Sequence, residues 1–136
     1  MESINSSRHW LSTVAAAADL CMKPWKHSAI AKDLQAVQDF TDKKEFDLIF
    51  RIECRSLEGE RHPKNDLEIE IFRSGKDLNL TLCLFDQPEQ PILWHGRHSI
   101  WMDGSSGKRS QSPSGGANLE ALARRIRSLI VKSEVI

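Results

Sequence analysis

The run from Gly104 to Arg109 has the composition of a phosphate-binding loop, with two glycines, two serines and a lysine. A Walker loop places a glycine five residues before the glycine of its Gly-Lys pair, and a serine or threonine that binds magnesium follows the lysine. In this chain those two places hold Met102 and Arg109. Both departures argue against a nucleotide-binding loop.

His95 and His98 are the residues best suited by type to ligate a metal ion. Their segment has the pattern of a β-strand, in which side chains three residues apart point to opposite faces. The pair could not share one ion without a bulge, and the spacing supplies no third ligand. We therefore expect no metal site, and we interpret His98 as a hydrogen-bonded histidine of the core.

Nucleophilic catalysis needs a serine or cysteine in contact with a base and an orienting group. Five serines and four glycines fall between residues 103 and 116, which predicts a flexible loop that positions no nucleophile, and the chain has no G-x-S-x-G turn. Cys21, Cys54 and Cys83 are odd in number and form no C-x-x-C pair, which excludes a disulfide framework and a zinc site. We expect a non-enzymatic protein without a cofactor.

The N-terminal segment has neither the basic start nor the long apolar stretch of a secretory signal, because Asp19 ends its alanine run. No stretch approaches the roughly 20 apolar residues of a membrane span. We therefore expect a cytoplasmic protein that does not bind membranes.

Charge is balanced overall but unevenly distributed. The 19 basic and 19 acidic residues cancel, whereas residues 91–136 carry seven basic and three acidic groups. Five of these cations could bind an anion or a nucleic-acid backbone. A solvated helix face that suits the helix dipole is the interpretation we favour, because the neutral chain argues against a nucleic-acid partner. The five are Lys108, Arg109, Arg124, Arg125 and Arg127.

Three segments have the apolar spacing of helices. The first runs from Ser7 to Cys21 and ends before Pro24. A second is predicted from about Ser28, a plausible N-cap, as far as Thr41. The third runs from about Asn118 to the end of the chain.

Between the second and third helices the apolar period changes to two, which predicts strands. The first strand covers residues 46–54, and the next two, 67–71 and 78–84, form a hairpin. With a Ser74-Gly75 turn, Ile71 would face Leu78, so that core residues meet across the pair. A fourth strand is predicted from Ile92 to Met102.

These elements predict a single α+β domain over residues 1–136, in the order ααββββα. Short connections favour a four-stranded antiparallel meander, with two N-terminal helices and one C-terminal helix covering one face. The segment 103–116 would be a loop within this domain.

If the helices cover the even-numbered face of the fourth strand, the opposite face keeps several large apolar residues among charges. That composition is typical of a partner site, so the preferred hypothesis is binding of another protein or of a second copy of the chain. Alternatively, the first helix or the 56–66 connection buries this face. The candidate contact residues are Phe72, Phe85, Leu93, Arg97 and Trp101.

A third hypothesis is a pocket between the helices and a curved sheet, which would take a small apolar ligand. Trp94 and His98 are the residues that would line it.

Overall fold

A computed structural model describes residues 7–33, 44–87 and 90–134 of the chain. Two α-helices in these ranges, α1 (Ser7–Cys21) and α3 (Gly116–Glu134), enclose six strands in the sequence. The strands are β1 (Lys26–Ala31), β2 (Glu45–Arg55), β3 (Leu67–Ser74), β4 (Asp77–Leu84), β5 (Ile92–His95) and β6 (Ser99–Met102). A short 3-10 turn, η2 (Pro63–Asn65), precedes β3.

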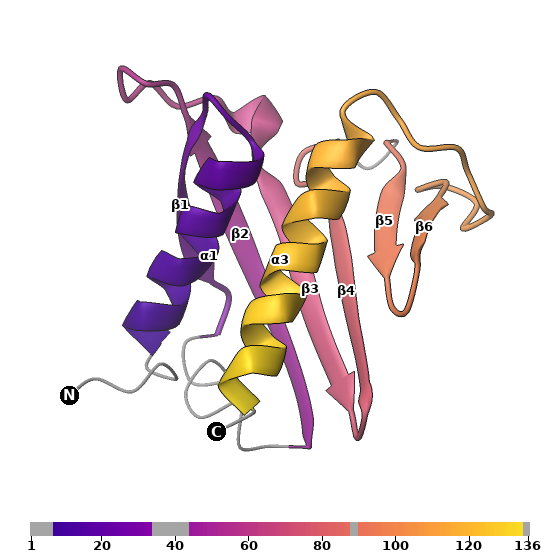
Figure 1. Cartoon of the computed structure of the whole chain (residues 1–136). Helices are drawn as coiled ribbons and strands as arrows, with labels where there is room; N and C mark the ends of the chain where they lie inside the picture. The colour runs from indigo at the N-terminus through magenta and orange to yellow at the C-terminus, as the bar shows by residue number, and fades with distance from the viewer. Residues whose placement is uncertain (1–6, 34–43, 88–89, 135–136) are drawn as a thin grey trace.

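All six strands form one antiparallel sheet in sequence order, β1 to β6. Both helices lie side by side across the same face of this sheet (Figure 1). The α+β class and the antiparallel meander are therefore confirmed, as is the first helix with its predicted bounds. The core lies between the two layers, and its largest side chains include Trp10, Phe50, Ile69, Leu80 and Leu122.

The predicted second helix is wrong over the residues that form β1. Ala29 pairs with Ile52 and Ala31 with Phe50, so this short segment gains its hydrogen bonds from a partner distant in the sequence. Alanine has little intrinsic preference for strands, but pairing with β2 stabilises the strand conformation more than this low preference disfavours it. The rest of the predicted helix, residues 34–43, lies outside the described residues.

The predicted β3–β4 hairpin exists, but its register was wrong by two residues. Ile71 pairs with Leu80 rather than with Leu78, and Ser74 pairs with Asp77. The turn is therefore Gly75-Lys76, and Gly75 supplies the positive φ of 61° that a tight hairpin turn requires. A slip of two residues keeps every side chain on its face, so the predicted core face of both strands is confirmed.

The predicted fourth strand is two strands, and its faces are inverted. The chain turns at residues 96–98, so β5 and β6 form a hairpin. Leu82 pairs with Leu93, which places Leu93, His95 and Trp101 on the face covered by the helices, where all three are buried. His98 lies exposed in the turn and is not a core residue.

The segment 103–115 connects β6 to α3. Arg109 forms a bridge with Met102, and the Asp103 carboxylate accepts hydrogen bonds from the backbone of Ser105 and Ser106. The Ser105 hydroxyl also donates to this carboxylate. That bond, followed by the two backbone bonds, lowers the pKa of Asp103 to about 2. The loop therefore runs back along β6, with Ser110 donating to the Trp101 carbonyl.

Candidate functional site

The sheet face that points away from both helices, here called the outer face, combines apolar and charged side chains. Alternation along each strand places on it the residues between the buried ones. Phe72 and Phe85 are 44% and 40% exposed, and Ile30 at the sheet edge is 48% exposed. The large apolar residues of the outer face are Ile30, Ile49, Phe72, Phe85, Ile92, Trp94, Ile100 and Met102.

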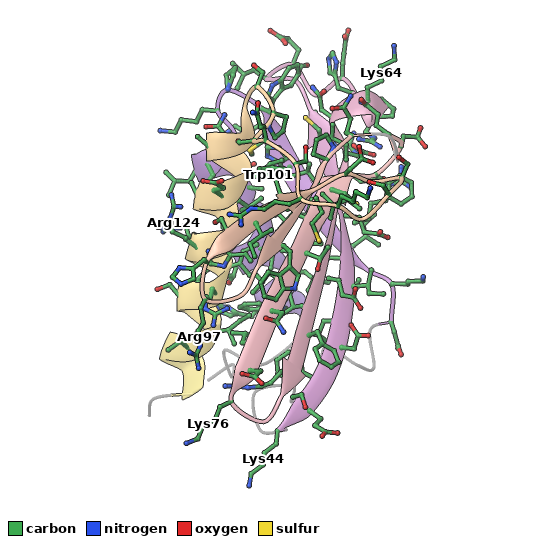
Figure 2. All side chains as sticks on the ribbon, turned by 90° about the vertical axis from the view of Figure 1, so that its right-hand side faces the viewer. Lys44, Lys64, Lys76, Arg97, Trp101 and Arg124 are labelled. Carbon is green, nitrogen blue, oxygen red and sulfur yellow. The ribbon has the colours of Figure 1, made fainter. Side chains whose placement is uncertain are left out.

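The five residues predicted to contact a partner do not all lie on the outer face. Phe72 and Phe85 lie on the outer face as expected. The placement of Leu93 and Trp101 there is wrong, because both are buried beneath the helices. Arg97 is exposed in the turn after β5 and lies on the side of the molecule that holds α3 (Figure 2).

Four outer-face residues of the β5–β6 hairpin belong to the even-numbered face, which the sequence hypothesis placed beneath the helices. Each is half-buried in the structure. The observation that could have identified their face is the pairing of the apolar Leu82 with Leu93, because it determines which face of the hairpin points toward the helices. The four residues are Ile92, Trp94, Ile100 and Met102.

In the described residues α1 does not cover the outer face (Figure 1), and the 56–66 connection covers only one end of it, where Arg61 donates to Glu53. α1 lies beside α3 on the other face (Figure 1). The 56–66 connection folds back at the end of the sheet, where Arg61 bridges to Arg55 and Lys64 marks that end (Figure 2).

A hollow of about 340 Å³ on the outer face lies beside the edge strand β1. The Arg51 guanidinium stands 4.1 Å from the centroid of the Phe85 ring, a cation–π distance. Ile30 and Ile49 supply apolar walls, and Glu68 adds a carboxylate. This hollow could accept an apolar side chain from a partner, with both charge signs at its border.

Next to the hollow, two carboxyl groups are close neighbours on adjacent strands. A hydrogen bond in which the protonated Glu70 donates to Asp47, together with burial and the charges of Asp47 and Glu68, raises the pKa of Glu70 to about 7. The charge of Lys32 opposes this shift. The outer face therefore loses a negative charge as the pH falls through neutrality.

A buried ion cluster stands where β2, the 56–66 connection and β3 meet. Asp66 is fully buried, and its carboxylate accepts two hydrogen bonds from Arg61, at 2.9 and 2.7 Å, and one from Arg51, at 3.0 Å. The backbone N–H of Cys54 donates a fourth, at 2.8 Å. Burial alone would raise the pKa of Asp66, but these bonds outweigh it and hold the pKa at about 2.

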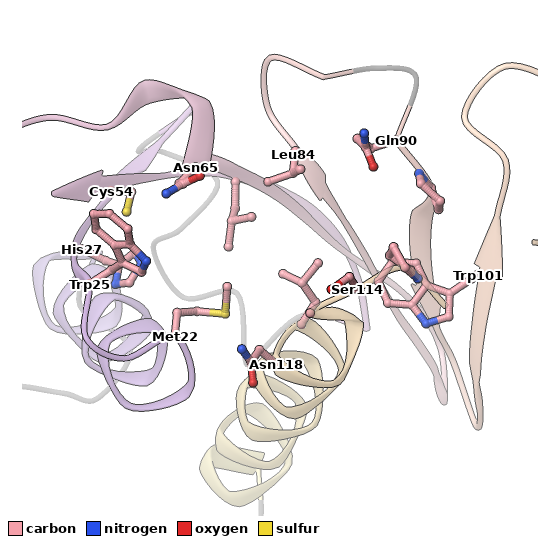
Figure 3. A pocket seen from close by; sticks show the side chains of 15 residues that line it. Met22, Trp25, His27, Cys54, Asn65, Leu84, Gln90, Trp101, Ser114 and Asn118 are labelled. Carbon is pink, nitrogen blue, oxygen red and sulfur yellow. The ribbon is translucent and has the colours of Figure 1, made fainter. Parts of the chain in front are cut away.

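A cavity of about 240 Å³, here called the end cavity, opens between the end of α1, the start of α3 and the sheet (Figure 3). Trp25 and Trp101 lie at its two sides, and Met22, just after α1, and Asn118 of α3 point into it. Neither Trp94 nor His98, the residues predicted to line a pocket, lines it.

Cys54 and His27 are cross-strand partners in the wall of the end cavity, and Asp19 accepts a hydrogen bond from His27 Nδ1 at 3.0 Å. A cysteine next to a histidine that is itself oriented by a carboxylate is the arrangement that thiol nucleophiles use. Burial, and then the charge of Asp66, raise the pKa of the Cys54 thiol, which disfavours the thiolate that nucleophilic attack needs. The sequence pattern missed the group because it placed residue 27 just before a helix.

The five candidate anion-binding cations are not gathered in one hollow. Arg124 and Arg125 line a hollow between the two helices together with Leu20 and Cys21. Arg127 donates a hydrogen bond to the Leu78 carbonyl. Lys108 and Arg109 belong to the loop after β6, on the far side of α3 from α1 (Figure 1).

Among the described residues, no group of three or more His, Cys, Asp or Glu side chains is arranged to hold a metal ion. In the same ranges, no helix combines the length and apolar character needed to cross a bilayer.

One protein-family model matches residues 11–129, and its description is a domain of unknown function (DUF8659). The match extends from α1 to α3 and so includes the whole sheet. Neither the curated proteins nor the solved structures contain a match to the chain.

Proposed function

Because this chain belongs to the DUF8659 family, a domain of unknown function, we propose its role from its own surface: it binds a second copy of itself through the outer face. The observation that carries this proposal is the exposure of Phe72, Phe85 and Ile30 on a sheet face that no described helix covers. Exposed apolar groups among charged ones are the usual composition of a binding surface.

Two features favour a second copy as the partner. The outer face carries both charge signs: Arg51 and Arg55 flank Glu53 toward one end of β2, and Glu45 and Asp47 lie toward the other. A surface of mixed sign can be complementary to itself across a twofold axis. The formal net charge of the chain is zero, so copies do not repel one another at long range.

The first test replaces Phe85 with aspartate. We expect the variant to be monomeric where the native chain is dimeric, because the substitution removes an aromatic contact and adds a carboxylate that the interface must desolvate even where it pairs with Arg51. Association should weaken at least about 30-fold. Sedimentation velocity over a concentration series measures the change. Leu57→Asp is the matched control, since Leu57 is 65% exposed in the 56–66 connection, outside the outer face. A native chain that stays monomeric at high concentration, or a control that dissociates equally, would reject the proposal.

A second test uses the acidity of Glu70. Its raised pKa of about 7 means that the carboxyl is mostly protonated at pH 6 and mostly ionised at pH 8. An ionised Glu70 adds charge that must be desolvated at the interface, so the dimer should bind several-fold more tightly at pH 6 than at pH 8. Glu70→Gln mimics the protonated form and should remove most of this difference. Equal pH dependence in both chains would exclude Glu70 from the interface.

A further inference from the structure

The lining of the end cavity suits an uncharged ligand. None of the described residues that line it is Asp, Glu, Lys or Arg. The two indoles, Trp25 and Trp101, supply flat apolar walls, and Leu67 and Leu84 add aliphatic ones from the sheet. A charged molecule would be desolvated here without an ionic partner, which costs several kcal/mol.

The polar side chains of the lining are amides, a histidine, a serine and a thiol. Asn65 and Asn118 can each donate and accept hydrogen bonds from opposite sides of the cavity (Figure 3). The His27 side chain is 2% exposed, and its Nδ1 is occupied by Asp19, which leaves Nε2 for a ligand. By contrast, the Trp101 Nε1–H donates to Glu120 at 2.8 Å, so this indole offers a ligand its ring and not its donor.

Size limits the ligand further. An engineered apolar cavity of about 150 Å³ is enough to hold benzene. The end cavity, at about 240 Å³, has room for a second fused ring but not for a drug-sized molecule.

We propose that the end cavity binds an uncharged, flat molecule of one or two aromatic rings carrying one or two hydrogen-bonding groups. The site lies at the helix-covered end of the sheet and shares none of Ile30, Phe72 and Phe85 with the outer face. Its occupation is therefore independent of the proposed self-association.

The test titrates indole into the ¹⁵N-labelled full chain and follows the four tryptophan side-chain N–H signals by NMR. We expect the signals of Trp25 and Trp101 to shift, and that of Trp94, on the outer face, to stay. The expected Kd is roughly 10 μM to 1 mM, the range open to a ligand of about nine non-hydrogen atoms. Indole-3-carboxylate, which adds a negative charge to the same rings, should bind at least about tenfold more weakly.

A variant that fills the cavity separates specific binding from general adsorption. Asn118 is exposed in the first turn of α3 and points toward the cavity (Figure 3). Asn118→Trp should weaken indole binding at least about tenfold, which corresponds to 1.4 kcal/mol. Ala117→Trp, one residue earlier, exposed and outside the lining, should change it less than about twofold.

Phe85→Asp provides the second control, because it alters the outer face alone and should leave indole affinity unchanged. Trp25 and Trp101 signals that do not move at millimolar indole would overturn the proposal. So would tighter binding of the carboxylate, or equal losses in Asn118→Trp and Ala117→Trp.

Discussion

Asp66→Ala is expected to lower the free energy of unfolding by about 3–5 kcal/mol, the usual cost of removing one partner from a buried ion pair. Asp66 is fully buried, and four hydrogen bonds from Arg61, Arg51 and the Cys54 backbone converge on its carboxylate. The substitution leaves those donors facing a void and two guanidinium groups without their counter-charge. Urea denaturation followed by circular dichroism measures the loss.

Two further variants identify the source of this effect. Asp66→Asn keeps an oxygen that can accept from the Cys54 N–H but removes the charge, so we expect a smaller loss of about 1–3 kcal/mol. Asp77→Ala removes an exposed aspartate from the start of β4 and should cost less than about 0.5 kcal/mol. An Asp66→Ala loss as small as that of Asp77→Ala would contradict a structural role for the ion cluster.

The same carboxyl predicts how stability changes with acid. Its pKa is about 2 in the folded chain against 3.8 for an ordinary aspartate, so the unfolded chain takes up the proton first. The stabilisation is complete above about pH 5 and is lost as the pH falls toward 2, an effect of about 2 kcal/mol. Asp66→Asn should lack this part of the acid dependence. Equal acid sensitivity in the native chain and Asp66→Asn would assign the effect to other groups.

Elements with a strong local period could be predicted from the sequence. The first helix, the strand around Phe50 and the C-terminal helix each bury the stripe that their spacing indicates. The strand β1 could not be recognised, because Ala29 and Ala31 resemble helix formers until Ile52 and Phe50 pair with them. A pairing partner distant in the sequence is information that a local window does not contain.

The faces of β5 and β6 were ambiguous for a different reason. Both faces of this segment are apolar, with Trp94 on one and Trp101 on the other, so alternation alone could not assign the inner one. Only the pairing with β4 decides it.

The end cavity and the ion cluster are both products of the assembled fold. Arg51, Arg61 and Asp66 are five to fifteen residues apart in the sequence and meet only after β2 pairs with β3. The cavity joins the end of α1, at Cys21, to the start of α3, at Gly116, which are 95 residues apart in the sequence. No spacing rule links such residues, so the sequence could predict a pocket between the layers but not its lining.

Trp101→Ala is expected to destabilise the chain by about 3–5 kcal/mol, the range for truncating a buried aromatic residue. Trp101 is 4% exposed, and its indole N–H donates to Glu120 of α3. The ring also packs against the first residue of that helix, since a Cβ at Gly116 would lie 3.0 Å from Trp101 Cζ2. Removing the indole therefore loosens the attachment of α3 to β6 as well as opening a hole.

Trp94→Ala is the matched comparison, because the same side chain is removed from the same hairpin but from the outer face. Trp94 is half-buried, so its loss should cost about 1–2 kcal/mol. The sequence hypothesis, in which the helices cover the even-numbered face of this segment, places Trp94 on the inner face and predicts the reverse order of the two losses. Chemical denaturation of both variants thus distinguishes the two assignments. A larger loss for Trp94→Ala than for Trp101→Ala would show that the two faces of the hairpin are assigned the wrong way round. Trp94 would then not lie on the outer face, and Trp101 would not line the end cavity.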